Sequence, residues 1–232
     1  MAEQKVEVDP VVRSRLGERT LADLRRNLWA IDCQSCGRAF GRFRTPVLGV
    51  RDHGDTATVA LHHRRCLPSP WVDAPEVSLA GEPMLSWRAS VALLPGDRLL
   101  FLVNPSCESA MLLPDGDGWR VGTLELFMRL GLVTDPLDRS EEALLVPGLN
   151  AALHPDRLSV HLRAPAGLPS HSWHCLTNPL SPVMPRLQSR DRLLVGVTTA
   201  LRVGSGIRDY ELLTAMADQQ IAFGMAELLR AP

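Results

Sequence analysis

The chain lacks the segments that mark membrane and secreted proteins. No stretch approaches the roughly 18 consecutive apolar residues that a membrane-spanning helix needs. The polar, charged segment 1–10 has no apolar core of the kind found in a secretory signal. Five cysteines in 232 residues are too few for a disulfide framework. We therefore expect a cytoplasmic protein with reduced thiols and no attachment to a membrane.

Lysine is nearly absent, because Lys5 is the only one and arginine supplies the other basic side chains. This bias is typical of a GC-rich bacterial genome. The formal net charge of -1 excludes a global attraction to nucleic acid or to anionic lipid. Any contact with nucleic acid must therefore come from a local patch.

Hydrophobic residues make up 45% of the chain, which is enough to bury a core. The length suits one domain with a small additional module. A proline-rich connector over 67–75 places the boundary near residue 72. We expect an N-terminal helix plus a metal-binding hairpin module in residues 1–72, and an α+β domain in residues 73–232.

The most specific pattern is Cys33-Gln34-Ser35-Cys36, followed by His62-His63-Arg64-Arg65-Cys66. Two thiols two residues apart can bind one metal ion from a single turn. Strands expected at 47–50 and 56–61, with a turn at 53–55, bring the second group back beside the first. Neighbouring strand residues face opposite sides, so only one of the two histidines turns inward. The pattern predicts a structural zinc ion bound by Cys33, Cys36, His63 and Cys66, with His62 as the alternative to His63.

This order of thiol turn, hairpin and second ligand pair resembles zinc-ribbon and treble-clef modules over residues 29–66. The resemblance implies a metal ion that replaces core volume in a small hairpin. Four protein ligands leave no open coordination position, so the expected role is structural and not catalytic.

The remainder reads as α+β, with strands expected at 99–103, 158–162 and 193–201. The segment 210–229 has apolar residues at helical spacing and predicts a long C-terminal helix. The expected fold class is thus α+β. A small zinc-stapled β-hairpin module at the N-terminus would pack on a mixed, mainly antiparallel sheet that carries this helix.

Arginines with interleaved aromatics follow the first thiol pair. Arg38, Arg42 and Arg44 alternate with Phe40 and Phe43. Such a loop can hold phosphates and stack bases, which makes these arginines candidate nucleic-acid contacts. The alternative is a solvated loop whose phenylalanines pack under the module.

A second group of chemical residues lies in 170–175, with His171, His174 and Cys175. It predicts either part of a second metal site or a histidine that activates a thiol such as Cys107 or Cys175. A strand would place His171 and His174 on opposite faces, which weakens both ideas.

The preferred hypothesis is a non-enzymatic, zinc-stabilised binding protein whose partner is a protein, a second copy or nucleic acid, with no catalytic residue. The alternative is an enzyme with a pocket on the α+β domain that uses His171, His174 and Cys107.

Overall fold

The computed structural model describes most of the chain as two compact units. It covers residues 5–29, 31–41, 44–74, 84–86, 88–94, 96–107, 109–136, 139–163, 170–176, 182–203 and 207–230. The first unit comprises residues 1–77 and 105–123, and the second comprises residues 78–104 and 124–232. The fold is α+β with mixed sheets, as the sequence predicts.

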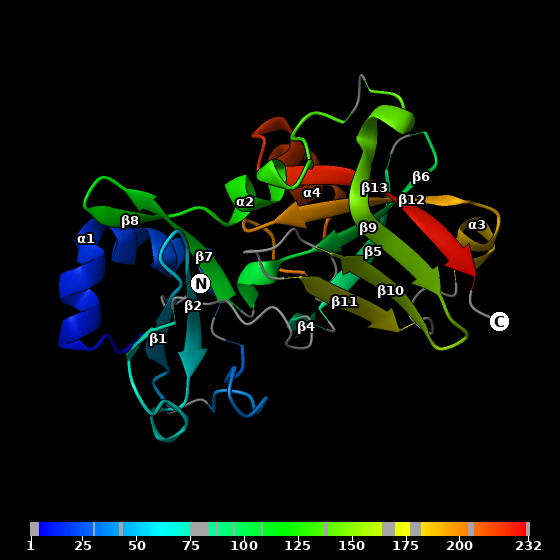
Figure 1. Cartoon of the computed structure of the whole chain (residues 1–232). Helices are drawn as coiled ribbons and strands as arrows, with labels where there is room; N and C mark the ends of the chain where they lie inside the picture. Colours follow the sequence, from blue (N-terminus) through cyan, green and yellow to red (C-terminus); the bar gives the residue numbers. More distant parts are fainter. Residues whose placement is uncertain are drawn as a thin grey trace. The chain divides into compact units, whose positions relative to one another are not determined.

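The first unit is a five-stranded sheet on which one helical segment packs, and this segment is kinked at Gly17 (Figure 1). Its strand order is β3-β1-β2-β7-β8. The elements are α1 (Pro10–Asn27), β1 (Val47–Asp52), β2 (Ala57–His62), η1 (Arg64–Cys66), β3 (Trp71–Asp73), η2 (Pro105–Cys107), β7 (Ser109–Asp115) and β8 (Gly118–Val121). Leu21 and Leu24 of α1 share one buried cluster with Val50, Val59 and other apolar side chains of the sheet.

The expected hairpin is present, but it is not a separate module. β1 and β2 pair antiparallel, with Val47 opposite His62. The other edge of β2 pairs with β7, which comes from residues 109–115. A two-stranded hairpin is marginally stable alone, and an unpaired strand edge invites other pairings. Pairing with β7, which itself pairs with β8, adds strands to the hairpin and pairs the second edge of β2. The division into residues 1–72 and residues 73–232 stays a prediction.

The second unit contains an eight-stranded sheet of order β4-β11-β10-β9-β13-β12-β6-β5. Its strands are β4 (Met84–Ser86), β5 (Ala89–Leu94), β6 (Arg98–Val103), β9 (Leu145–Leu153), β10 (Arg157–Leu162), β11 (His171–Leu176), β12 (Arg192–Thr198) and β13 (Ile221–Arg230). Its helical segments are α2 (Thr123–Arg129, whose first residue belongs to the first unit), η3 (Glu142–Leu144), α3 (Met184–Gln188) and α4 (Asp209–Ala217). The pairs β4–β11, β6–β12 and β9–β13 are parallel, and the other neighbours in this sheet are antiparallel.

Buried clusters line both faces of the part of this sheet that β5, β6, β12 and β13 form. Phe127 of α2 and Leu187 of α3 pack on one face, in the larger of the two buried clusters of this unit. Leu212 and Ala215 of α4 pack on the other face. Alternate residues of β6 belong to different clusters. Phe101 is in the first cluster, and Leu100 and Leu102 are in the second.

The prediction of a long C-terminal helix over 210–229 is wrong. Helix α4 ends at Ala217, and Gln219 has a positive φ of 55°. The chain then enters β13, whose residues 221–226 are all buried between β9 and β12. A strand buried on both faces carries a continuous apolar run, and periodicity cannot distinguish such a run from a buried helix.

In the part of the chain that the structure describes, no helix is both long enough and apolar enough to cross a membrane.

Candidate metal centre

The first thiol pair lies on a tight turn that closes on itself. The Cys33 amide donates to the Arg38 carbonyl at 2.9 Å, and the Gly37 amide donates to the Cys33 carbonyl at 2.8 Å. Gly37 has a φ of 66°, a left-handed conformation that glycine adopts without steric cost. The Gln34 amide donates to the Leu61 carbonyl at 3.0 Å, which attaches this turn to β2. The two cysteines therefore lie beside the end of the hairpin.

The end of β2 delivers the second ligand pair. His63 follows the last residue of the strand, and the short helix η1 ends at Cys66. The Cys66 amide donates to the His63 carbonyl at 2.8 Å, which folds the cysteine back. The Ser35 hydroxyl donates to the Cys66 carbonyl at 3.1 Å. The thiol turn and η1 are thus joined directly.

Cys33, Cys36, His63 and Cys66 come together as the sequence predicts. Their four ligand atoms all lie within 4.8 Å of one another. None of the five cysteines, all of which lie in the described part of the chain, forms a disulfide. In a tetrahedral zinc site with bonds of about 2.3 Å to sulfur and about 2.05 Å to nitrogen, neighbouring S and N ligands lie roughly 3.6 Å apart. The Cys36 Sγ to His63 Nδ1 distance of 3.5 Å matches that spacing. The donor set and its spacing therefore fit a metal ion.

The surroundings of the cluster favour a thiolate at Cys33. Burial raises the pKa of this thiol, but hydrogen bonds from the backbone amides of His63, Ser35 and Cys36 outweigh that effect and bring the pKa down to about 6. The His63 amide lies 3.3 Å from the Cys33 sulfur. The pKa of Cys66 is raised, first by desolvation and then by the neighbouring thiols. A cation at the centre would favour the deprotonated form of both of these thiols.

His63 and His62 have different roles. His63 is 6% exposed and belongs to the cluster. Phe40 contacts its imidazole edge-on, with ring centroids 5.1 Å apart. The His62 Nδ1 instead lies 2.8 Å from the Ser35 hydroxyl. His62, which lies outside the cluster, thus contacts the thiol turn through Ser35.

The structure describes the proposed nucleic-acid loop only in part. Arg38 and Arg44 are exposed, whereas Arg42 and Phe43 lie outside the described residues. Phe40 is partly buried against the core of the first unit and the His63 ring. This aromatic side chain therefore has a packing role in the first unit.

His171 and His174 do not share a site, because they project from opposite faces of β11. His171 is 4% exposed and stacks on Trp173, with ring centroids 5.3 Å apart and planes inclined by 2°. Burial lowers its pKa to about 4. Cys107 is buried in the first unit, whereas both histidines belong to the second.

His174 has a neighbour that the sequence analysis missed. His161 of β10 lies beside it, with ring centroids 5.8 Å apart. The available signal was the alternation in Leu158-Ser159-Val160-His161-Leu162, which places Ser159 and His161 on one face of a strand.

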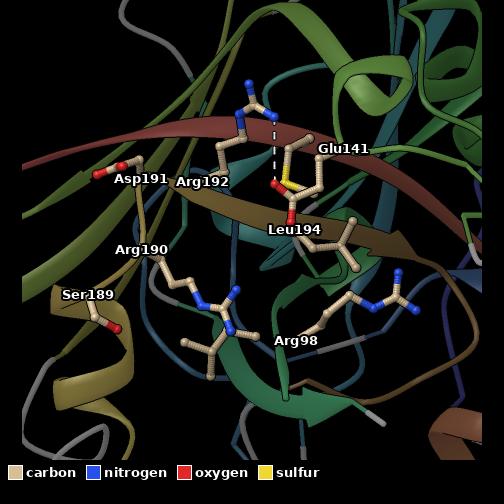
Figure 2. Close-up of a pocket in the computed structure, with 9 residues that line it drawn as sticks. Arg98, Glu141, Ser189, Arg190, Asp191, Arg192 and Leu194 are labelled. Carbon is tan, nitrogen blue, oxygen red and sulfur yellow. Dashed lines mark ion pairs between the residues drawn. The ribbon is translucent and has the colours of Figure 1, made fainter. Parts of the chain in front are cut away.

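The second unit also contains a pocket of about 380 Å³ lined by Arg98, Arg190, Arg192, Glu141 and Asp191 among others (Figure 2). Arg192 pairs with Glu141 at 3.6 Å and with Glu142 at 2.8 Å. Asp191 pairs with Arg230 at 3.2 Å. Neither His171 nor His174 lines this pocket. Ion pairs thus line part of this recess, and the alternative hypothesis of an enzyme stays a prediction.

Comparison with protein-family models, with curated proteins and with solved structures finds no match for this chain.

Proposed function

We propose that this protein is a non-enzymatic cytoplasmic binding protein whose N-terminal unit is held together by a structural zinc ion. The ligands are Cys33, Cys36, His63 and Cys66. One observation carries the proposal, namely that the four ligand atoms lie within 4.8 Å of one another in a hydrogen-bonded turn and hairpin. The donor set supports zinc as the metal, since three thiolates and one imidazole suit this ion.

A structural role is favoured over a catalytic one by the number of protein ligands. A tetrahedral site with four of them has no position for a substrate or an activated water. The zinc would stabilise the attachment of the thiol turn to the end of β2. The exposed surface around the turn is then available for a partner, which we propose to be another protein or a second copy of this one.

Metal content tests the proposal. Protein purified without an affinity tag or added metal, and dialysed extensively, is expected to retain one zinc ion per chain by elemental analysis. Cys36→Ser should reduce retained zinc at least tenfold, because only three ligands remain. Cys175→Ser is the matched control, since this thiol is in the second unit, and it should retain zinc fully.

Cobalt substitution provides a second readout. A thiolate-to-cobalt charge-transfer band should appear in the wild-type protein and weaken in Cys36→Ser. Folded, reduced wild-type protein that contains no zinc and shows no such band would contradict the proposal.

Nucleic acid is the second candidate partner, because Arg38 and Arg44 are exposed beside the metal centre. If the two arginines make two phosphate contacts, raising the salt concentration from about 50 to about 200 mM should weaken the binding of a labelled oligonucleotide about tenfold. Replacing both arginines with alanine should remove most of that salt dependence. Arg129→Ala in the second unit is the control and should change nothing. An affinity that does not change with salt concentration, or no binding at low salt, would eliminate nucleic acid as the partner.

A further inference from the structure

The pocket of the second unit lies where two neighbouring parallel strands begin. Arg98 is the first residue of β6, and Arg192 is the first residue of β12. Leu100 pairs with Leu194 in this ladder, so the two arginines, each two residues earlier, lie beside each other on the same face of the sheet. Adjacent strands are about 4.8 Å apart. Both arginines line the pocket, and their like charges are therefore close enough to repel unless each has a counter-charge.

The protein supplies a counter-charge to Arg192 but not to Arg98. Arg192 pairs with Glu142 at 2.8 Å and with Glu141 at 3.6 Å, and the dashed line in Figure 2 marks the second pair. No ion pair or side-chain hydrogen bond joins Arg98 to any residue in the part of the chain that the structure describes. Arg98 is nonetheless partly buried. Removing water from a guanidinium without supplying a counter-charge is unfavourable, so an anion from solution would be stabilised beside Arg98.

Arg190 adds a second cation whose own pairing is weak. Its Nη2 lies 3.9 Å from one carboxylate oxygen of Asp97, whereas the Nε of Arg186 lies 2.9 Å from the other oxygen. One carboxylate therefore serves two arginines. The Arg190 side chain is 44% exposed, so its guanidinium can turn toward a ligand in the pocket without leaving a buried position.

The acidic residues of the pocket are engaged by other arginines and do not neutralise Arg98. Glu141 pairs with Arg192, and Asp191 pairs with Arg230 at 3.2 Å. The charged groups of the pocket and of its ion pairs are Arg98, Arg186, Arg190, Arg192 and Arg230 against Asp97, Glu141, Glu142 and Asp191. Five positive charges thus face four negative ones, and one bound monoanion would balance them.

The volume of the pocket suits an organic molecule. Its size of about 380 Å³ falls in the range of about 300–1,000 Å³ that small-molecule sites occupy. Leu99, Leu194 and Met225 also line the pocket and are at most 6% exposed, so packing fixes their positions. A ligand can therefore be larger than an inorganic ion, with its charged group at Arg98 and a short apolar part beside these side chains.

We propose that this pocket binds a small organic carboxylate, whose two oxygens accept hydrogen bonds from the Arg98 guanidinium, with Arg190 as the second cation. A guanidinium presents its donors in a planar fork that matches a carboxylate. A phosphate monoester fits less well, because it carries a charge of about −1.5 to −2 at pH 7 and would lie near Glu141 and Asp191. The site is independent of the proposed zinc centre, whose ligands all belong to the first unit.

Titration of the full-length protein with benzoate and with hexanoate at low ionic strength tests this proposal, followed by the NMR signals of the ligand and of the arginine side chains. We expect at least one of the two carboxylates to bind saturably with millimolar affinity, as suits ligands of this size, and to shift the Nε–H signal of Arg98. Benzamide and hexanamide, which have the same shapes without the charge, should bind at least tenfold more weakly. Phenyl phosphate should bind more weakly than benzoate.

Substitutions at Arg98 test whether this side chain holds the carboxylate. Arg98→Gln should weaken binding at least tenfold, and Arg98→Lys should recover part of the affinity, because lysine keeps the charge but lacks the planar fork. Arg163→Gln is the matched control, since Arg163 is an exposed arginine of the second unit that does not line the pocket. It should bind both carboxylates as the wild type does. Circular dichroism of each variant verifies folding.

Two results would overturn the proposal, namely no saturable binding of either carboxylate to the folded wild type, or equal binding by the wild type and Arg98→Gln. Tighter binding of phenyl phosphate than of benzoate would overturn the assignment of a carboxylate. None of these results bears on the zinc retained at the cysteine centre, so the two sites are tested separately.

Discussion

At the scale of single residues, His171 shows how burial sets a charge. The ring is enclosed by Trp173 and Phe127, and its Nε2 has no hydrogen-bond partner among the described residues. A protonated imidazole in this position would lack both water and a counter-charge. The neutral ring is therefore part of the folded core, which accounts for the pKa of about 4.

This burial predicts a loss of stability in mild acid. An unfolded chain protonates His171 near pH 6.5, whereas the folded chain does so only near pH 4. Between these values the unfolded state binds more protons, so the free energy of unfolding falls as pH falls. We expect urea unfolding to show that the difference in stability between the wild type and His171→Leu shifts by about 2 kcal/mol from pH 7 to pH 5, in favour of the variant. A pH-independent difference would contradict this.

At the scale of elements, β13 illustrates how context overrides local pattern. Its residues alternate between two cores, with Ala222 and Ala226 on one face and Phe223 and Met225 on the other. Gly224 fits because an added Cβ would lie 2.6 Å from a methyl group of Val146. The polar stretch Asp218-Gln219-Gln220 is where the helix ends.

The sequence predicts the hairpin of β1 and β2 more accurately than it predicts β13. Strands expected at 47–50 and 56–61 form as β1 and β2, because turn residues separate two short apolar runs. Local signals of this kind are read from neighbouring residues alone. The pairing of β2 with β7, some fifty residues later in the chain, has no such local signal. The five-stranded sheet therefore could not be predicted from the hairpin.

At the scale of the whole molecule, the proposed zinc site should act on one unit only. All four ligands belong to the first unit, and metal binding energy contributes to the folding of the part that supplies the ligands. After removal of the metal with a chelator, amide hydrogen exchange in β1 and β2 should accelerate at least tenfold. Exchange in β6, β12 and β13 should stay unchanged.

Cys36→Ser protein is the control for this experiment, because the chelator should leave its exchange pattern unaltered. An equal acceleration in the strands of both units would show that the metal stabilises the chain as a whole. No acceleration in either unit would show that the thiol turn is held by its hydrogen bonds alone. Either outcome would contradict a structural role confined to the first unit.

The sequence by itself determined the cysteine cluster, because its ligands are close in sequence and a short hairpin brings them together. It also determined that the fold is α+β. Only the tertiary structure decided that His63 and not His62 faces the cluster, and that residues 221–230 form a central strand. It alone paired His161 with His174. These outcomes depend on which strands become neighbours, and that choice is made by burial over the whole chain and not by any local run of residues.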